Sequence, residues 1–261
     1  MIKSIRKCMQ IMSVISDGRG KPVSLLKISQ STDIPKPTCI HIIKSLMEDG
    51  YLEQVSHTQG YVLGPSTYYL SRFGKYNQSF VTVCRPVMKW LNRQTGYSTI
   101  LAVIQGRKKY IIDYVNSDSG YKFNRSDEDI FTDDIYRTAT GRVILSHMSD
   151  SEVEKIYSLY GLPTSYDQWK EVESLETLKK ELKKIREKSF CQSAVHTEKS
   201  GLYSFGYAMP IFEKYVCIGA IGVSIRIPPE EYETFKKEEP KVLAALQKAT
   251  KEVNRRLKFN L

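Results

Sequence analysis

Apolar residues in the first part of the chain recur with the period of amphipathic helices. Residues 4–16 carry one such stripe, which consists of Ile5, Cys8, Met9, Met12 and Ile15. Residues 24–30 carry a shorter stripe, and residues 36–49 carry another, which consists of Cys39, Ile42, Ile43 and Leu46. The pattern predicts helices that each bury one side in a common core, with residues 31–34 as a polar turn.

Short runs with strand-like composition follow these helices. Residues 51–54 and 60–64 are separated by residues 55–59, which predicts a β-hairpin. Residues 65–78 return to a helical pattern and carry aromatic and apolar residues on one side, namely Tyr68, Tyr69, Leu70 and Phe73. The pattern alone is compatible with a helix that packs on its own domain.

The pattern changes in the second half of the chain. Residues 79–95 form one more amphipathic helix, and β-branched residues then dominate positions 98–105 and 109–115, which predicts a second hairpin. The remaining segments are a long polar loop over 116–136, helices beginning at 138 and spanning 175–188, a hairpin over 205–212 and 216–226, and C-terminal helices over 230–257. This order predicts an α+β domain with an antiparallel sheet.

The polar side of the helix over residues 36–49 has an unusual composition. Its residues are Lys36, Pro37, Thr38, Ile40, His41 and Lys44. Basic and hydrogen-bonding side chains on one helical face suit the phosphates and base edges of DNA, and one apolar side chain can contact a thymine methyl group. Two short helices joined by a tight turn and followed by a hairpin form a winged helix-turn-helix. The sequence therefore predicts a DNA-binding domain over residues 1–64.

The charge distribution agrees with a polyanionic partner. The formal net charge is +10 at pH 7, and residues 1–75 contain ten Lys or Arg against five Asp or Glu. This segment holds half of the excess positive charge in less than a third of the chain. A basic protein without a nucleic-acid partner can show the same net charge, so the charge supports the helix pattern and does not replace it.

The cysteines indicate a reducing compartment. The five cysteines lie far apart, mostly in apolar runs, and no pair has the spacing of a zinc site or a redox motif. The first residues include Lys3, Arg6 and Lys7 and lack a signal-peptide cleavage pattern, and no apolar run approaches the length of a membrane span. We expect a cytoplasmic protein without metal ions or other cofactors.

Catalytic patterns are sparse. The Gly-Val-Ser run at residues 222–224 lacks the closing glycine of a nucleophile elbow and lies inside an apolar run. Cys191, His196 and Glu198 are the residue types of a thiol triad, but such triads assemble in space, so nearness in sequence is not evidence. We expect no enzymatic activity. The alternative is an enzyme with a thiol or serine nucleophile and a DNA-binding appendage.

The first domain resembles a known family. Residues 34–38 (Ile-Pro-Lys-Pro-Thr), the helix that leads into residues 48–52 (Glu-Asp-Gly-Tyr-Leu), and residues 60–64 (Gly-Tyr-Val-Leu-Gly) are similar to the DNA-binding domain of IclR-family bacterial transcription regulators. The family commonly has serine where Pro37 stands and arginine where His41 stands. The bases recognised by this helix should therefore differ from those recognised by the family.

The predicted DNA contacts lie on this helix and on the hairpin. The expected residues are Lys36, Pro37, Thr38, Ile40, His41, Lys44, His57 and Gln59. Lys36 and Thr38 should mostly hold phosphates, whereas Ile40, His41 and Lys44 should meet base edges. The hairpin residues should meet the adjacent groove or the backbone. The resemblance, together with the symmetry of helix-turn-helix sites, implies a homodimer or tetramer and an operator that is a rough palindrome.

The second domain, residues 79–261, resembles the effector-binding domain of the same family, which has a GAF-like fold. The similarity lies in residues 137–142 (Arg-Thr-Ala-Thr-Gly-Arg) and in the strand pair ending at residues 220–224 (Ala-Ile-Gly-Val-Ser). It implies that residues 65–78 form a linker helix and that a small organic effector, often a carboxylate or an aromatic compound, binds between the sheet and the long loop. The alternative is a seam of small residues that serves only packing.

The expected effector contacts are Tyr121, Phe123, Ala139, Thr140, His196, Gly222 and Ser224. The first two lie in the long loop, which is of a kind that often closes over ligands. The resemblance places Ala139 and Thr140 at a helix N-terminus whose free N–H groups suit an anion, and Gly222 and Ser224 on the pocket floor. Together the domains predict a sequence-specific transcription regulator whose operator affinity is controlled by the effector.

Overall fold

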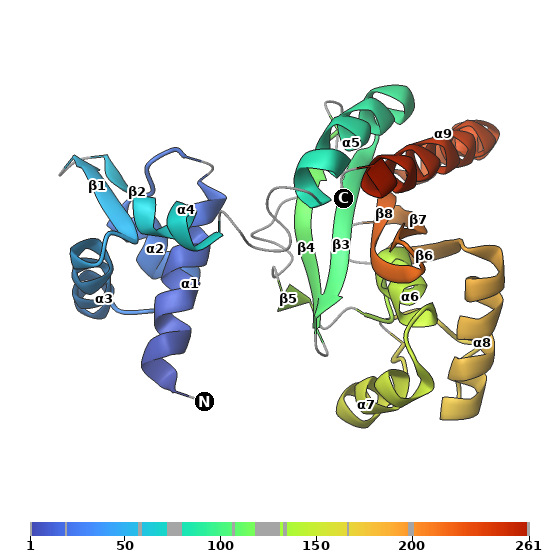
Figure 1. The fold of residues 1–261 in the computed structure, drawn as a ribbon, viewed down its shortest axis with the longest axis horizontal. Coiled ribbons are helices and arrows are strands. Elements are labelled where there is room, and N and C mark those ends of the chain that lie inside the picture. The colour runs from blue at the N-terminus through green and yellow to red at the C-terminus, as the bar shows by residue number, and fades with distance from the viewer. Residues whose placement is uncertain are drawn as a thin grey trace. The chain divides into compact units, whose positions relative to one another are not determined.

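The computed structural model describes residues 2–18, 20–56, 59–71, 80–105, 108–117, 131–132, 135–165, 167–197 and 201–259. The chain divides into two compact units, Met1–Gln78 and Ser79–Leu261. The first unit contains helices and a two-stranded sheet, and the second contains a six-stranded antiparallel sheet between helices (Figure 1). This arrangement confirms the predicted α+β class.

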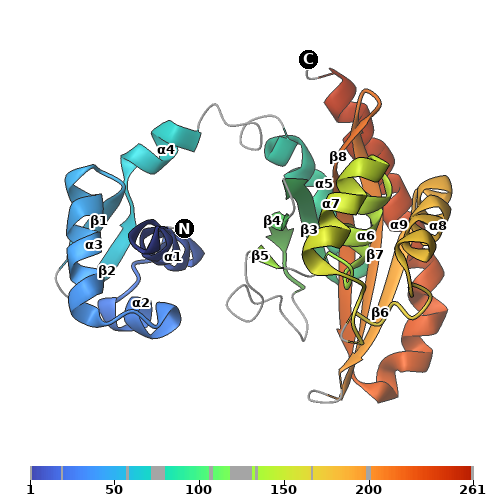
Figure 2. The ribbon, with the colours of Figure 1, turned by 90° about the horizontal axis from the view of Figure 1, so that it is seen from below.

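The first unit is the predicted winged helix-turn-helix. Its elements are α1 (Lys3–Asp17), α2 (Leu25–Thr32), α3 (Lys36–Glu48), β1 (Leu52–Ser56) and β2 (Gly60–Leu63). In Figure 2, α3 lies along one margin of this unit, with the β1–β2 pair beside it and α1 beyond the strands. The helix bounds lie within two residues of the predicted ones.

The core of the first unit is formed by residues from its three longer helices, the segments between them and β1. It contains Ile11, Ile15, Val23, Ile28, Ile34, Cys39, Ile43, Leu46 and Leu52. The predicted stripe on α3 is confirmed, with Ile42 half-buried at its margin. The stripe on α1 is partly wrong, because Ile5 and Met9 are 54% and 56% exposed whereas Ile11 is fully buried. The first turns of α1 extend past α2, so they have no core to face (Figure 1).

Local chemistry sets the ends of the first unit's helices. The Ser24 hydroxyl accepts a hydrogen bond from a backbone N–H and caps α2. Gly50 ends α3 in a left-handed conformation, with φ of +72°. The N–H groups of Gly50 and Tyr51 donate to carbonyls in the last turn of α3, which is a Schellman motif. The predicted helix over residues 36–49 therefore ends within one residue of the observed end at Glu48.

The hairpin is attached to the start of the helix-turn-helix. β1 and β2 pair antiparallel, with Leu52 opposite Leu63 and Gln54 opposite Tyr61. Val23 also pairs with Tyr61, which periodicity did not predict. The Val23 N–H donates to the Tyr61 carbonyl and the Tyr61 N–H donates to the Val23 carbonyl, both at 2.9 Å. Because Val23 directly precedes Ser24 and α2, this bridge fixes the wing to the helix-turn-helix.

The helix α4 (Pro65–Ser71) follows the wing. Tyr68, Tyr69 and Leu70 are 67%, 63% and 65% exposed. The described part of the predicted linker helix therefore does not bury its aromatic side in its own unit. Residues 72–78, with Phe73, lie outside the described residues.

The second unit is built on a sheet with strand order β5-β4-β3-β8-β7-β6. The strands are β3 (Ser98–Gln105), β4 (Lys108–Val115), β5 (Phe131–Thr132), β6 (Cys191–Thr197), β7 (Leu202–Glu213) and β8 (Val216–Ile227). The helices are α5 (Thr82–Thr95), α6 (Ala139–Ser146), α7 (Asp150–Tyr160), α8 (Leu175–Lys188) and α9 (Tyr232–Phe259), with a 3-10 turn at Pro229–Glu231. The pairing of β3 with β8 brings the first and last strands of the unit together in the middle of the sheet.

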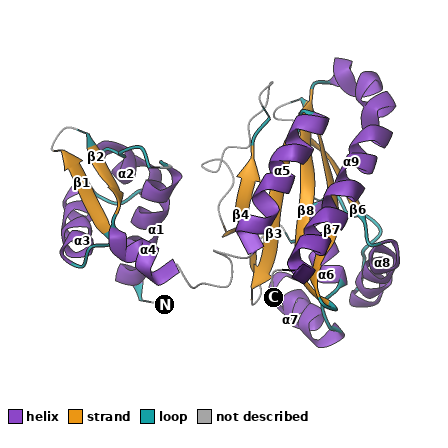
Figure 3. Cartoon of the chain, turned by 45° about the horizontal axis from the view of Figure 1, so that its top comes forward, coloured by secondary structure: helices purple, strands orange, loops and turns teal. Residues whose placement is uncertain are grey.

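Helices cover both faces of this sheet. α5 and α9 pack against each other and on β3 and β7, and Figure 3 shows them in front of the strands. α6 packs on the other face across β3, β7 and β8, and α8 packs against the outer side of α6. The small residues at the start of α6 and the glycines of β8 allow this close contact, which positions a cavity described below.

Periodicity missed three elements of the second unit. β5 has two residues, α7 has a weak apolar stripe, and β6 is polar along much of its length. β6 adds a strand before the predicted hairpin, because it pairs with β7 from Cys191 opposite Ala208 to Thr197 opposite Leu202. Residues 118–130 of the predicted long loop lie outside the described residues.

Candidate DNA interface and effector cavity

The solvent-facing side of α3 presents the residues predicted to contact DNA. Lys36, Pro37, His41 and Lys44 are exposed, and Thr38 and Ile40 are half-buried. The opposite side is anchored in the core, where Cys39 and Ile43 are at most 1% exposed. A helix held in this way projects lysine, imidazole and hydroxyl groups outward with little freedom to tilt.

The turn between α2 and α3 is fixed by polar contacts. Asp33 has a left-handed backbone conformation, with φ of +52°, and Ile34 is 3% exposed. The Ile34 carbonyl accepts hydrogen bonds from the Ser29 hydroxyl at 2.7 Å and from the Cys39 thiol at 3.4 Å. Burial raises the pKa of Cys39. This thiol therefore orients the two helices and is not a reactive group.

The wing carries the other predicted DNA contacts. Gln59 is exposed near the tip of the hairpin, where its N–H donates to the Ser56 hydroxyl at 3.0 Å. His57 lies outside the described residues. A hairpin tip beside a recognition helix is suited to contact the DNA backbone or the neighbouring groove.

A cavity of about 100 Å³ lies between α6 and the sheet of the second unit. Its lining comes from β3, β4, β6, β7 and β8 and from the N-terminal end of α6. Among the polar residues that line it are Lys109, Arg137, Thr138, Thr140, Ser193, Ser204, Ser224 and Arg226. Because side chains alternate between the faces of a strand, Gly222, Ser224 and Arg226 of β8 all belong to the α6 side.

This one cavity brings together four of the seven residues predicted to contact an effector. They are Ala139, Thr140, Gly222 and Ser224. Tyr121 and Phe123 lie outside the described residues, and so does the side chain of His196. The lining includes Ser193 of the same strand, β6.

The cavity also contains three cationic residues that the sequence pattern did not indicate, Lys109, Arg137 and Arg226. Lys109 is 2% exposed, and its ammonium donates to the Thr138 hydroxyl at 2.9 Å. A buried ammonium needs hydrogen bonds or negative charge nearby. Gly222, Ser224 and Arg226 alternate along β8, and this spacing could have predicted that Arg226 lies on the same side of the strand as the other two. Lys109 stands near a hairpin turn, where sequence favours exposure.

Side chains occupy part of the N-terminus of α6. The Thr138 hydroxyl accepts a hydrogen bond from the Gly141 N–H at 3.2 Å, and the Ala139 N–H donates to the Ser193 hydroxyl at 3.2 Å. The expectation of free N–H groups is therefore wrong for these two positions. Positive charge for an anion in this cavity comes mainly from the cationic side chains.

The glycine-lined seam serves packing as well as the cavity. A Cβ atom at Gly222 would lie 2.8 Å from the Tyr207 carbonyl oxygen and 3.0 Å from the Thr140 methyl carbon. Only glycine lets α6 approach the strand this closely. Gly222 nevertheless lines the cavity too, so the packing interpretation and the pocket interpretation describe the same seam.

The groups considered for catalysis are poorly placed for it. Cys191 is 4% exposed, and burial raises the pKa of its thiol to about 11, so the thiol is protonated at neutral pH. Ser224 lies inside β8, opposite Gly206 and Ser98, and not at a sharp turn. The described residues contain no cluster of His, Cys, Asp or Glu able to hold a metal ion. None of their helices has both the length and the hydropathy of a membrane span.

Two family models match the chain. The IclR helix-turn-helix domain matches residues 4–56, and the bacterial transcriptional regulator IclR C-terminal domain matches residues 76–255, more than half of the chain. The chain belongs to the IclR family. The described helix-turn-helix of this IclR-family protein falls in the first matched region, and the α6 cavity falls in the second.

Curated and solved relatives support this assignment. The HTH-type transcriptional regulator XynR of Escherichia coli (strain K12) is 21% identical over 168 residues, 63% of this chain and 64% of XynR. The chain spans less than two thirds of the length of the curated relatives it matches. An IclR homolog from Microbacterium hydrocarbonoxydans, complexed with 4-hydroxybenzoate, has a TM-score of 0.69 at 18% identity and covers 98% of this chain and 100% of its own. Thermotoga maritima IclR has a TM-score of 0.62 at 19% identity, with coverage of 99% and 100%. At such identities the two structures show the fold alone.

Proposed function

We propose that this protein is a sequence-specific DNA-binding transcription regulator whose operator affinity is controlled by a small organic anion bound in the α6 cavity. The observation that carries the proposal is the outward side of α3, where Lys36, His41 and Lys44 are exposed while the core anchors the other side. Winged helix-turn-helix proteins place such a helix in the major groove. Membership of the IclR family supports the same function.

The proposed DNA contacts divide into positioning and recognition. Lys36 and Thr38 mostly hold phosphates, and Ile40, His41 and Lys44 meet base edges. Lysine and histidine donors suit the acceptors of guanine in the major groove, and an isoleucine suits a thymine methyl group. The wing, with His57 and Gln59, reaches the adjacent backbone or groove.

The proposed effector is a small carboxylate, with or without an aromatic ring. Lys109, Arg137 and Arg226 supply positive charge, and Ser204 and Ser224 supply hydroxyl groups. The volume of about 100 Å³ admits only a small molecule. The related Microbacterium protein was solved with 4-hydroxybenzoate, which belongs to this chemical class.

Coupling between effector and DNA requires that the effector bind the DNA-competent and incompetent arrangements unequally. We propose the linker helix as the element that differs between them. The exposed Tyr68, Tyr69 and Leu70 of α4 suit a contact between subunits, in line with a homodimer or tetramer on a roughly palindromic operator. A cytoplasmic location, in contact with genomic DNA, belongs to the same proposal. Enzymatic activity is not part of the proposal, because the Cys191 thiol is buried and protonated.

Selection of bound fragments from random duplex DNA is the decisive test. Full-length protein is incubated with a random duplex pool, and the retained fragments are amplified and sequenced over successive rounds. We expect enrichment of a rough palindrome with half-sites about one helical turn apart. The double variant Lys36→Ala with Lys44→Ala should enrich nothing. Lack of enrichment by the native protein would defeat the proposed function.

A further inference from the structure

The sheet face opposite the effector cavity carries a groove that the proposed function does not use. It lies between α5 and α9 and has a volume of about 580 Å³. Pro86, Val87 and Trp90 form its α5 wall. The α9 wall contains four cationic side chains and one carboxylate, namely Lys248, Lys251, Arg255, Arg256 and Glu252.

The charged wall occupies one side of α9. Ala244, Lys248, Lys251 and Arg255 follow one another at the three- and four-residue spacings that place side chains on one helical face. At about 1.5 Å per residue this face is about 16 Å long, the length of about five residues of extended chain. The groove therefore has the dimensions of a site for a short peptide segment.

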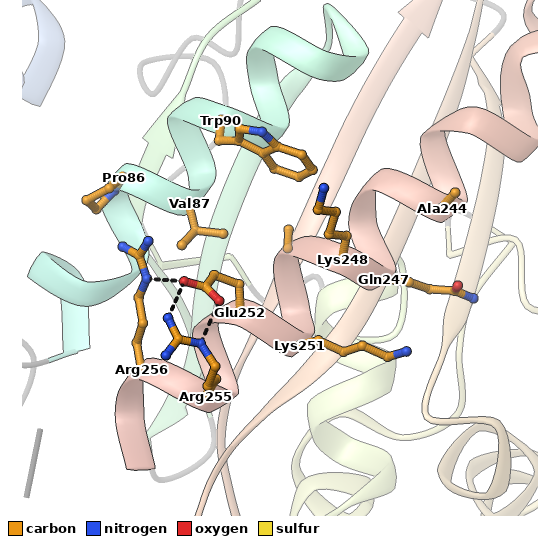
Figure 4. Close-up of a pocket in the computed structure, with 11 residues that line it drawn as sticks. Pro86, Val87, Trp90, Ala244, Gln247, Lys248, Lys251, Glu252, Arg255 and Arg256 are labelled. Carbon is orange, nitrogen blue, oxygen red and sulfur yellow. Dashed lines mark hydrogen bonds and ion pairs between the residues drawn. The ribbon is translucent and has the colours of Figure 1, made fainter. Parts of the chain in front are cut away.

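The groove residues are already oriented by one another (Figure 4). The Lys248 ammonium lies over the Trp90 ring, 5.2 Å from its centroid. Glu252 accepts hydrogen bonds from the Arg255 and Arg256 guanidinium groups at 2.8 and 2.7 Å. Binding to pre-oriented side chains costs less conformational entropy than binding to free ones.

Helix stability does not account for this charge. Cations in the last turn of a helix interact favourably with its dipole, and this explains Arg256 and Lys258 at the end of α9. The effect falls off within one turn. Lys248 and Lys251 lie well before the last turn, so the helix dipole does not account for their position.

We infer that the α5–α9 groove is a docking site for an acidic segment of a partner protein, one that carries an aromatic residue among its aspartates and glutamates. The positive wall complements the acids, and Trp90 receives the ring. Tryptophan and arginine are the residue types that dominate binding energy in protein interfaces.

Fluorescence anisotropy with the full-length protein tests the inference. The probe is a labelled synthetic peptide in which Asp and Glu residues flank one Phe. We expect saturable binding that weakens at least about tenfold in Trp90→Ala and in Lys248→Glu with Lys251→Glu. The double variant Lys180→Glu with Lys183→Glu, on exposed positions of α8, makes the same charge change and should bind as the native protein does. Thermal melts check that each variant is folded.

Three outcomes would overturn the inference. The first is absence of saturable binding, or equal binding to the groove and α8 variants, which would mean general attraction to a basic protein. The second is that duplex DNA without the operator motif competes with the peptide for the native protein, and that this competition is lost in the variant Lys248→Glu with Lys251→Glu. The third is a change of oligomeric state in the groove variants without peptide, seen by sedimentation, which would assign the groove to a second copy of the chain.

Discussion

Lys44 offers the simplest test of the DNA surface. It is exposed on α3, so its truncation removes charge without leaving a cavity in the core. Lys44→Ala should weaken binding to the selected operator by about 1 kcal/mol, roughly fivefold. If its ammonium contacts a phosphate, the slope of log affinity against log salt should also fall by about one. Titrations at several salt concentrations measure both quantities, with Lys180→Ala on α8 as the control. Affinities and slopes equal to those of the native protein would remove Lys44 from the interface.

His147 is expected to make the stability of the second unit depend on pH. Its ring packs edge-on against Phe212 with centroids 5.0 Å apart, and its Nε2 is buried without a hydrogen-bond partner among the described residues. Burial lowers its pKa below the ordinary 6.5, and the positive charge of Arg186 adds to this. As pH falls, the unfolded chain takes up the proton first. The stabilisation is therefore complete above about pH 6.5 and is lost as pH falls through the folded-state pKa.

Thermal melts across this range check the sign. Between about pH 7 and pH 5 the melting temperature of the native protein should fall more steeply than that of His147→Gln, whose side chain does not titrate. Replacement of a histidine on the surface of another unit, His41→Gln, leaves the environment of His147 unchanged and should reproduce the native slope. Parallel curves for the native protein and His147→Gln would assign the pH dependence to other groups.

Individual side chains were predictable where one helix or strand determines their surroundings. The outward position of His41 and Lys44 follows from the apolar stripe that includes Cys39, because a helix core-anchored on one side exposes the other. Lys109 was not predictable. Its burial is accompanied by a hydrogen bond to the Thr138 hydroxyl, which comes from a residue far along the chain.

Elements were predictable where caps and periodicity agree. The helix α8 has the predicted bounds, because Ser174 caps it and its apolar stripe is regular. The helix α7 also has a capping box, formed by Ser149 and Glu152, but a weaker stripe. β6 could not be found locally. Its polar residues favour a strand only because β7 supplies the pairing partner, and strand preference depends strongly on such context.

The contact between α6 and β8 leaves no room for a larger side chain at Gly222. In Gly222→Val the added atoms would clash with the Tyr207 carbonyl, which the β7–β8 pairing holds in place, and with Thr140. Overpacking of this kind should lower the free energy of unfolding by about 1–3 kcal/mol. Urea unfolding followed by circular dichroism measures it. Val216→Thr, at a position of the same strand that is 66% exposed, should unfold as the native protein does. A stable Gly222→Val protein would show that α6 can move away from the sheet.

For the whole molecule, the proposal requires that a ligand in one unit change the DNA affinity of the other. A panel of small carboxylates, 4-hydroxybenzoate among them, is first screened by thermal shift. A true effector at about a hundredfold excess over its dissociation constant stabilises the fold by about 2.7 kcal/mol. Operator titrations with and without that compound then measure the coupling. We expect it to change operator affinity in the native protein.

Ser224→Trp should abolish this response. Ser224 lines the cavity, and an indole there fills a space of about 100 Å³. The variant should lose both the thermal shift and the coupling while it binds the operator with native affinity, since α3 lies in the other unit. Lys109→Met, which removes charge at similar size, should weaken binding of the carboxylate more than binding of its neutral amide analogue. Val216→Thr again serves as the control. A Ser224→Trp protein that still answers its effector would place the effector site elsewhere, and loss of operator binding in that variant would mean that the substitution disturbs more than the cavity.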